Sequence, residues 1–187
     1  SQAYSNIPEL VVLCPTSAEE YQNMLDWSIE QKEHPVLILI PGNAVSHREA
    51  DKDFSKLDAY KVEQKGEKLA IIALGDFYQR GEELAKSVKE TLGFTPTLIN
   101  PRFASGLDTE LLENLKKDHS LIVTLEDGIL SGGFGEKIAS FYGASEMKVK
   151  NYGLEKKFYD RYNPEDLLAS LGMTTEQMTS EVKKILG

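Results

Sequence analysis

The sequence predicts an α/β protein with three layers, in which helices cover both faces of a mostly parallel sheet, preceded by a partial βαβ unit. Three observations support this fold class. Short apolar runs alternate with segments of helical periodicity along residues 69–151, the pattern of strands joined by crossover helices. Several runs are apolar without interruption, as strands buried on both faces are. Polar residues and glycines follow the predicted strands, where open parallel sheets usually place their sites.

Residues 10–40 predict one βαβ unit. Strands are expected at residues 10–13 and 36–40, and Ser17 and Glu20 have the spacing of a capping box before a helix. The expected inward positions of this helix are Tyr21, Met24, Leu25, Ser28 and Ile29. Two parallel strands with one helix cannot cover both faces of a sheet, so we expect the missing strands to lie upstream.

Residues 43–58 are polar, charged and weakly periodic, which predicts a solvated linker. His47, Arg48 and Glu49 lie in this segment, and we interpret them as solvated residues rather than as a site. The expected organisation is therefore the end of one domain at residues 1–43, a linker at 44–59 and a second domain at 60–187.

The second domain carries the alternating pattern. Strands are expected at residues 60–64 (an edge strand), 69–74, 96–99, 121–125 and 147–151. Helices are expected at residues 78–92, 108–117, 134–142, 165–171 and 175–186. Gly93 is a C-terminal cap, Asp108 and Thr174 are N-terminal caps, and Pro164 opens a first turn.

The composition narrows the class of partners. A net charge of −9 repels phosphate backbones, which argues against nucleic-acid binding. The longest purely apolar run beside a strand is five residues, far short of a membrane helix at about 20. Cys14 is the single cysteine and no signal peptide is recognisable, so we expect a cytoplasmic protein without disulfides.

Two glycine-containing turns are candidate phosphate sites. The turn that starts at Gly75 has Phe77 where a dinucleotide fingerprint needs its second glycine, so a tight structural turn is expected. Gly132, Gly133 and Gly135 precede a helix whose free N–H groups can hold an anion, but no Lys-Ser/Thr pair follows. A sharp turn with close helix packing is the preferred interpretation.

Three charged residues complete this candidate loop cluster. Glu126 and Asp127 end a predicted strand and point to opposite faces, so we expect a turn, or a partner for Arg102, rather than an acid–base pair. Arg102 follows Pro101, where it grips an anion, forms a structural ion pair or makes a subunit contact; the sequence leaves these alternatives open. The cluster is therefore a possible anion or interface site.

Metal and thiol chemistry are not expected. The histidines at 34, 47 and 119 show no metal-ligand spacing. Cys14 has no activating base nearby in the sequence, so a buried apolar thiol is expected.

Several of these motifs resemble one family. Asn-Pro-Arg-Phe at residues 100–103, Gly-Leu-Asp at 106–108, Glu-Asp at 126–127 and Gly-Gly-Phe-Gly at 132–135 are similar to the C-terminal domain of the transketolase superfamily, in particular the 1-deoxy-D-xylulose-5-phosphate synthase family. Residues 7–16 resemble the end of that family's pyrimidine-binding domain. The resemblance spans nearly the whole chain but only the back part of the family's length.

The resemblance implies an enzyme that uses thiamine diphosphate and Mg²⁺ to join pyruvate and glyceraldehyde 3-phosphate, with loss of carbon dioxide, in isoprenoid biosynthesis. The cofactor and catalytic residues of the family lie upstream, so it implies no catalytic, cofactor or metal residue in this chain. The chain alone is then expected to be inactive and to serve assembly with the upstream domains, as a homodimer.

One departure concerns the substrate. The family commonly has arginines where this sequence has Leu39 and Gly42, and such an arginine holds the substrate phosphate. The acceptor is therefore open. Two other functions also remain: a stand-alone dimerisation or partner-binding module, and the beta component of a 2-oxo acid dehydrogenase.

Overall fold

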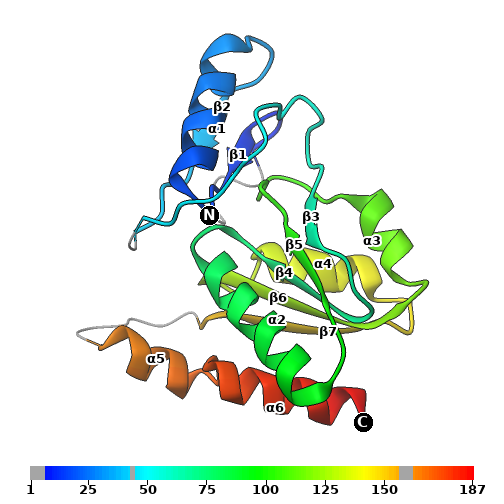
Figure 1. The fold of residues 1–187 in the computed structure, drawn as a ribbon. Coiled ribbons are helices and arrows are strands. Elements are labelled where there is room, and N and C mark those ends of the chain that lie inside the picture. Colours follow the sequence, from blue (N-terminus) through cyan, green and yellow to red (C-terminus); the bar gives the residue numbers. More distant parts are fainter. Residues whose placement is uncertain (1–6, 43–44, 156–161) are drawn as a thin grey trace.

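The computed structural model describes residues 7–42, 45–155 and 162–187, and these residues form two sheets (Figure 1). The larger sheet has the strand order β3-β5-β4-β6-β7. Its strands are β3 (Lys61–Gln64), β4 (Lys68–Ala73), β5 (Thr97–Asn100), β6 (His119–Ile129) and β7 (Lys148–Leu154). All neighbours pair in parallel except β3, which lies antiparallel to β5 at the edge.

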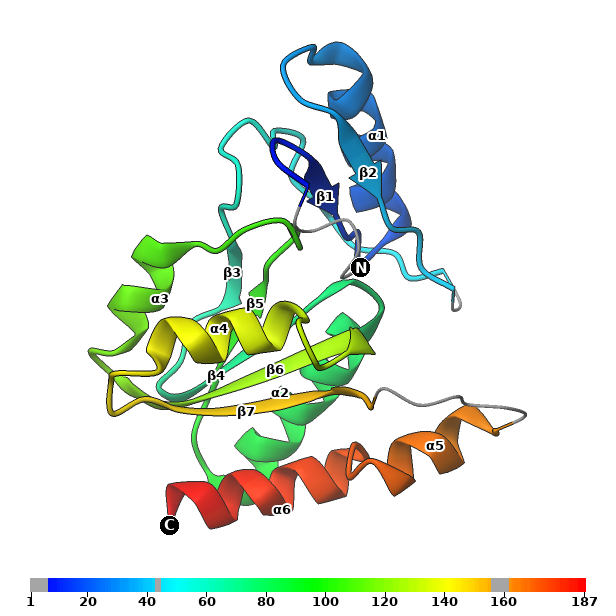
Figure 2. The same cartoon turned by 180° about the vertical axis from the view of Figure 1, so that it is seen from behind.

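Helices cover both faces of the larger sheet. They are α2 (Tyr78–Leu92), α3 (Thr109–Leu115), α4 (Phe134–Tyr142), α5 (Pro164–Ser170) and α6 (Thr175–Leu186). Figure 1 shows α2, α5 and α6 on one side of the sheet, and Figure 2 shows α3 and α4 on the other. The expected three-layer α/β/α fold is confirmed.

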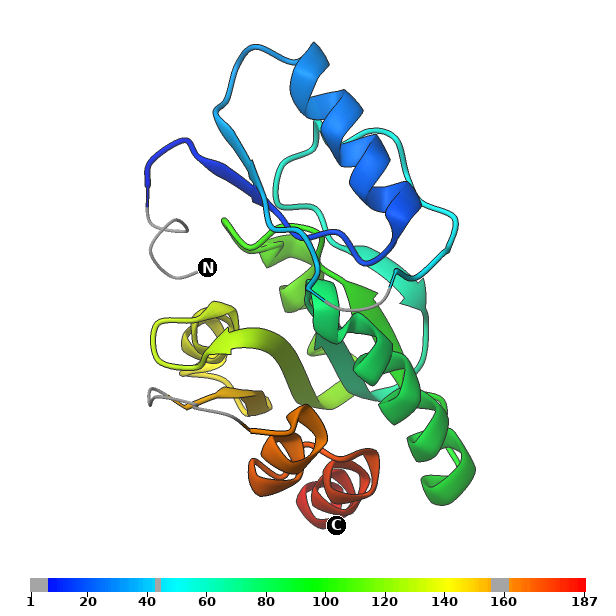
Figure 3. The ribbon, with the colours of Figure 1, turned by 90° about the vertical axis from the view of Figure 1, so that its left-hand side faces the viewer.

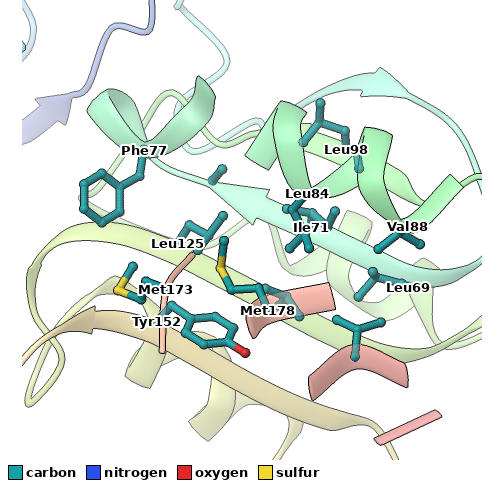
Figure 4. Close-up of a cluster of buried hydrophobic side chains, with 14 of the residues drawn as sticks. Leu69, Ile71, Phe77, Leu84, Val88, Leu98, Leu125, Tyr152, Met173 and Met178 are labelled. Atoms are coloured by element: carbon teal, nitrogen blue, oxygen red, sulfur yellow. The ribbon is translucent and has the colours of Figure 1, made fainter. Parts of the chain in front are cut away.

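Alternation along the central strand produces the two cores. Leu69 and Ile71 of β4 pack among Leu84, Val88 and Met178 from α2 and α6 (Figure 4). The intervening residues Ala70 and Ile72 face the opposite core, which includes Leu112 of α3 and Ile138 of α4. Each β4 side chain from 69 to 73 is fully buried, because a parallel strand in this position has no solvent face.

Local capping explains where the helices begin and end. Asp108 accepts from the backbone N–H of Leu111 at 3.0 Å, and Thr174 and Gln177 form a reciprocal capping box. Gly93 ends α2 with φ at +79°, a left-handed conformation that glycine adopts without a Cβ clash. The bounds of α2, α4 and α6 coincide with the expected ranges.

The N-terminal unit forms a separate small sheet. β1 (Val11–Leu13) and β2 (Val36–Ile38) pair in parallel and are joined by α1 (Ala18–Glu30). Figure 3 shows this unit lying over one end of the larger sheet. The expected βαβ connection is therefore present, although β2 is shorter than the apolar run that predicted it.

Two details of α1 differ from the expectation. The helix buries Glu20 and Met24, whereas Ile29, expected to face inward, is 70% exposed. Ser17 caps the helix as expected by accepting from Glu20 N at 3.1 Å. The Glu20 carboxylate, however, does not return to the Ser17 N–H; it accepts from the Thr16 N–H at 2.8 Å. The buried side of α1 therefore carries the Glu20 carboxylate beside Met24, and not Ile29.

The segment after β2 is more than a solvated linker. His47 and Glu49 are exposed, but Phe54 is only 1% exposed and its ring meets Trp27 of α1 edge-on at 6.1 Å. Arg48 lies over the ring of Tyr78 and pairs with Glu82 at 3.0 Å. A polar sequence with one buried aromatic residue has no periodicity, so the sequence pattern does not predict this contact.

None of the described helices has both the length and the apolar character needed to cross a bilayer.

Phe54→Ala should lower the free energy of unfolding by about 3 kcal/mol, because it removes a fully buried ring and leaves a cavity. Val45→Ala in the same segment is the control, since Val45 is 71% exposed and should change stability by less than about 0.5 kcal/mol. Urea denaturation measures both. Equal effects of the two substitutions would show that the segment is not anchored.

Candidate functional site

The last residue of β5 and the loop that follows it, residues 100–105, hold the N-terminal unit on the larger sheet; we call this segment the docking loop. Arg102 has φ at +61°, a left-handed conformation that residues other than glycine rarely adopt. This turn brings the Arg102 carbonyl to Cys14 N at 2.7 Å and Ala104 N to the Val12 carbonyl at 2.9 Å. The docking loop thereby pairs with β1 as a short antiparallel bridge.

The side chain of Arg102 holds the linker. Nη2 and Nε donate to the carbonyl of Ala59 at 2.7 and 3.2 Å, and Nη1 lies 3.4 Å from Asp51 Oδ2. The guanidinium also lies 5.3 Å from the centre of the Phe54 ring, and the residue is 6% exposed. Of the alternatives that the sequence left open, these contacts favour the structural ion pair.

A buried carboxylate joins α1 to the end of β5. Glu20 is 3% exposed, and it accepts from Asn100 Nδ2 at 2.9 Å as well as from Thr16. Asn100 in turn accepts from Arg102 N at 3.1 Å, which supports the left-handed turn. Burial raises the pKa of Glu20, and the hydrogen bonds from Thr16 and Asn100 oppose that rise.

The glycine loop, residues 132–135, already binds an anion from its own chain. Glu126 is 1% exposed, and its two carboxylate oxygens accept from Phe134 N at 3.1 Å and from Gly135 N at 2.9 Å. These N–H groups belong to the first turn of α4, where the helix dipole also favours negative charge. The capacity for an anion predicted from the sequence is thus filled by Glu126.

This arrangement corrects two expectations for the Glu126–Asp127 pair. β6 continues to Ile129, so residues 127 and 128 extend the strand instead of forming a turn. No hydrogen bond or ion pair within the described part of the chain joins Glu126 to Arg102, so Glu126 is not the partner of that arginine. The expectation that the two carboxylates point apart is consistent with burial, since Asp127 is exposed.

Two glycines of the glycine loop are required by close approach. A Cβ at Gly133 would lie 2.6 Å from the carbonyl of Ile129 and 2.7 Å from Glu126 Oε1. A Cβ at Gly135 would collide with the hydroxyl of Thr124. Gly132 has φ at +73°, and its N–H donates to the carboxylate of Glu136. These close approaches are those of a sharp turn with close helix packing, the interpretation that the sequence favours.

Asp127 lies beside a second carboxylate that the sequence did not single out. Although Asp127 as a residue is exposed, partial desolvation of its carboxyl group and the neighbouring Asp76 raise the pKa of Asp127. Asp76 also accepts from Gly42 N at 3.1 Å, which connects the end of the N-terminal unit to the turn after β4. Both carboxylates line a cavity of about 230 Å³ that also touches Cys14 and Glu126.

Cys14 is an unreactive thiol in this setting. Burial raises its pKa to about 12, so the nucleophilic thiolate is scarce at neutral pH.

His119 is buried between Thr97 Oγ1 at 2.7 Å and the carbonyl of Leu115 at 3.1 Å. Across the residues that the structure describes, no three His, Cys, Asp or Glu side chains cluster as a metal site would require.

The predicted loop cluster therefore separates into parts. Arg102 belongs to the docking loop, whereas Glu126 and the three glycines form an internally satisfied helix cap. The sequence did not predict the roles of Glu20, Asn100 and Asp76. Glu20 has the spacing of a capping residue, Asn100 belongs to the Asn-Pro-Arg-Phe motif, and Asp76 lies in the turn that starts at Gly75.

The family "Transketolase, C-terminal domain" matches residues 58–178. The 1-deoxy-D-xylulose-5-phosphate synthase of Clostridium tetani is 33% identical over 188 residues, which are 97% of this chain and 29% of that protein. The enzyme of the same name from Alkaliphilus oremlandii is 32% identical over 185 residues, 96% of this chain and 29% of its own. The chain thus spans under a third of the length of these relatives.

Solved structures show the same fold at lower identity. A chain titled "Split gene transketolase, inactive beta4 tetramer" superposes with a TM-score of 0.85 at 22% identity, covering 99% of this chain and 60% of that one. A mutant transketolase from Pichia stipitis gives a TM-score of 0.69 at 15% identity, covering 98% of this chain and 26% of that one. At these identities the likeness establishes the fold alone.

Glu126→Ala should lower the free energy of unfolding by about 2 kcal/mol, because two N–H groups at the start of α4 lose their acceptor. Glu110→Ala in α3 removes an exposed carboxylate and is the matched control. Chemical denaturation compares the two variants. A loss for Glu126→Ala no larger than that for the control would contradict the helix-cap role.

Glu126→Gln should change how stability depends on pH. Burial raises the pKa of Glu126, so the folded protein binds this proton more readily than the unfolded chain does. The contribution of Glu126 to the free energy of unfolding is thus fully present below the pKa of an ordinary carboxyl group. It is lost as the pH rises through the pKa that Glu126 has in the folded protein. The variant should gain stability relative to the original protein as pH rises through that window. Parallel curves of unfolding free energy against pH would contradict this assignment.

Proposed function

Because this chain belongs to the family of transketolase C-terminal domains, we propose that it is the C-terminal part of a thiamine-diphosphate-dependent transferase similar to 1-deoxy-D-xylulose-5-phosphate synthase. The observation that carries the proposal is the continuous similarity to that synthase along 97% of this chain but 29% of the relative. In this proposal the chain serves assembly, and it is inactive without the domains that precede it in the relatives.

The small sheet of β1 and β2 supports the proposal that this chain assembles with domains that precede it in the parent protein. Among the described residues, β1 and β2 form a sheet of two strands, to which the docking loop adds a single bridge at Leu13. A two-stranded sheet is marginal without further strands or packing. The three residues of β2 are all half-buried, unlike those of β1, which are buried. Further strands of an upstream pyrimidine-binding domain, ending near residue 43, would complete this layer.

Two exposed apolar side chains lie where the N-terminal unit ends, just after β2. Ile40 and Val45 flank the end of the N-terminal unit and are 67% and 71% exposed. Apolar side chains gathered in this way are typical of surfaces that another domain or subunit covers. We assign their cover to the upstream domains and to the second subunit of a homodimer.

The residues of this chain do not fit the diphosphate of the cofactor at the glycine loop. The N–H groups that would bind a phosphate oxygen there are bonded to Glu126, and a Cβ-sized space is missing at Gly133. A diphosphate would therefore have to displace a buried carboxylate of the same sign. We place thiamine diphosphate and Mg²⁺ in the upstream domains and derive no catalytic step from residues of this chain.

Titration calorimetry of the purified chain with thiamine diphosphate and Mg²⁺ should give no saturable heat, because the candidate anion site is filled from within. The same titration with the full-length protein, upstream domains included, should saturate and is the positive control. Stoichiometric binding to the isolated chain would overturn the proposed division of roles.

Reconstitution separates the proposal from its alternatives. The chain mixed with the upstream polypeptide of its parent should form a stable complex that decarboxylates pyruvate and transfers the two-carbon unit to an aldehyde. Gel filtration and product analysis measure the two steps. A stable dimer that ignores the upstream polypeptide would favour the stand-alone module, and capture of an acyltransferase core would favour the dehydrogenase component.

A further inference from the structure

A groove of about 550 Å³ lies between β7 and α6. These two elements form its walls, and the turn between α5 and α6 completes the lining. Small-molecule sites in proteins have volumes of roughly 300 to 1,000 Å³, so the groove has room for a small ligand. Its lining is mainly polar, which sets it apart from the apolar surface that we assign to the cover of other domains. The polar lining residues are Lys150, Tyr152, Glu176, Gln177, Ser180 and Glu181.

The alternation of β7 explains why Lys150 faces this groove. Side chains two residues apart lie on the same face of a strand, so Lys148, Lys150 and Tyr152 all face α6. Lys148 Nζ donates to the carbonyl of Ile185 in the last turn of α6 at 3.1 Å. The Tyr152 ring packs in the core cluster that includes Met178 (Figure 4). Lys150 lies between them, half-buried, and forms no hydrogen bond or ion pair with any residue that the structure describes.

The hydroxyl of Tyr152 is a second group without a partner. Tyr152 is only 5% exposed, yet no described residue forms a hydrogen bond with its hydroxyl, although buried hydroxyls normally have one. Lys150 Nζ lies 5.4 Å from the centre of the Tyr152 ring, so a single carboxylate can contact both groups. Burial and the nearby carboxylate of Glu181 raise the pKa of Tyr152 to about 12. The hydroxyl therefore keeps its proton at neutral pH and is able to donate it in a hydrogen bond.

Two carboxylates on α6 line the same groove. Glu176 is exposed and Glu181 is half-buried, and neither forms a hydrogen bond or an ion pair within the described part of the chain. The amide of Gln177 beside them is already engaged, because it accepts from Thr174 N and donates to the carbonyl of Ala169. The groove thus presents one ammonium group and two carboxylates that have no charged partner among the described residues.

We propose that this groove binds a small diamino acid, a compound with one carboxylate and two ammonium groups. Lys150 and Tyr152 bind its carboxylate, and Glu176 and Glu181 bind one ammonium group each. The charges of such a ligand match those of the groove in sign and number, whereas a simple carboxylic acid or a phosphate ester would meet two carboxylates of its own sign. The proposal rests on this groove alone and does not depend on the transferase function proposed above.

Four probes of similar chain length test the proposal by removing one charged group at a time. L-Lysine carries all three groups, L-norleucine lacks the side-chain ammonium, 6-aminohexanoate lacks the α-ammonium, and 1,5-diaminopentane lacks the carboxylate. Each is titrated into the isotope-labelled chain while the amide signals of Lys150, Tyr152 and Glu181 are followed by NMR. L-Lysine should bind most tightly, and each other probe about tenfold more weakly, as the loss of one charge-assisted hydrogen bond predicts.

Substitutions test which residues bind the carboxylate. Lys150→Gln should lower the affinity for L-lysine about tenfold without lowering that for 1,5-diaminopentane, because only the carboxylate loses its partner. Tyr152→Phe keeps the buried ring, removes the hydroxyl and should lower the affinity for L-lysine about fivefold. Lys184→Gln makes the same charge change at an exposed position of α6 outside the groove, and it should leave the affinities unchanged.

The amide spectra also show whether each variant is folded, and the probe series in the original chain needs no substitution. Tightest binding of a probe other than L-lysine would overturn the proposal. So would equal effects of Lys150→Gln and Lys184→Gln, or the absence of a shift at the groove with every probe.

Discussion

The structure depends on the contact between the docking loop and β1. The left-handed turn at Arg102 places two backbone hydrogen bonds onto β1, and the buried pair of Glu20 with Asn100 fixes α1 over the same point. Buried carboxylates are tolerated only when hydrogen bonds satisfy them, so this pair specifies one way of seating the N-terminal unit. The linker is then held by Arg102, which donates to the carbonyl of Ala59.

A buried carboxylate that accepts hydrogen bonds from its own chain also explains the glycine loop. A helix start attracts anions, and a surface of net charge −9 offers many carboxylates. Glu126 reaches this helix start from within the sheet, so the motif has a structural use even though its composition suggests a phosphate site. Anion-binding geometry and anion-binding function are therefore separate questions, and the partner of the N–H groups decides between them.

The junction between the small and large sheets combines features that point to a larger assembly. A two-stranded layer and exposed apolar residues at its end both lie at this junction. Both features are explained if upstream domains complete the layer and cover these residues. The stability of the seating, from Phe54 and Glu20, then matters to function as well as to folding.

The sequence alone determined the layers, the order of the elements and most helix ends, because apolar periodicity and caps such as Asp108, Gly93 and Thr174 act over a few residues. It also identified the motifs at residues 100–103 and 132–135. Only the tertiary structure decided their roles, since Glu126 meets the glycine loop eight residues on, Glu20 meets Asn100 across 80 residues, and Phe54 anchors a polar segment. Such pairings have no local signature: they depend on which surfaces the completed sheet brings together.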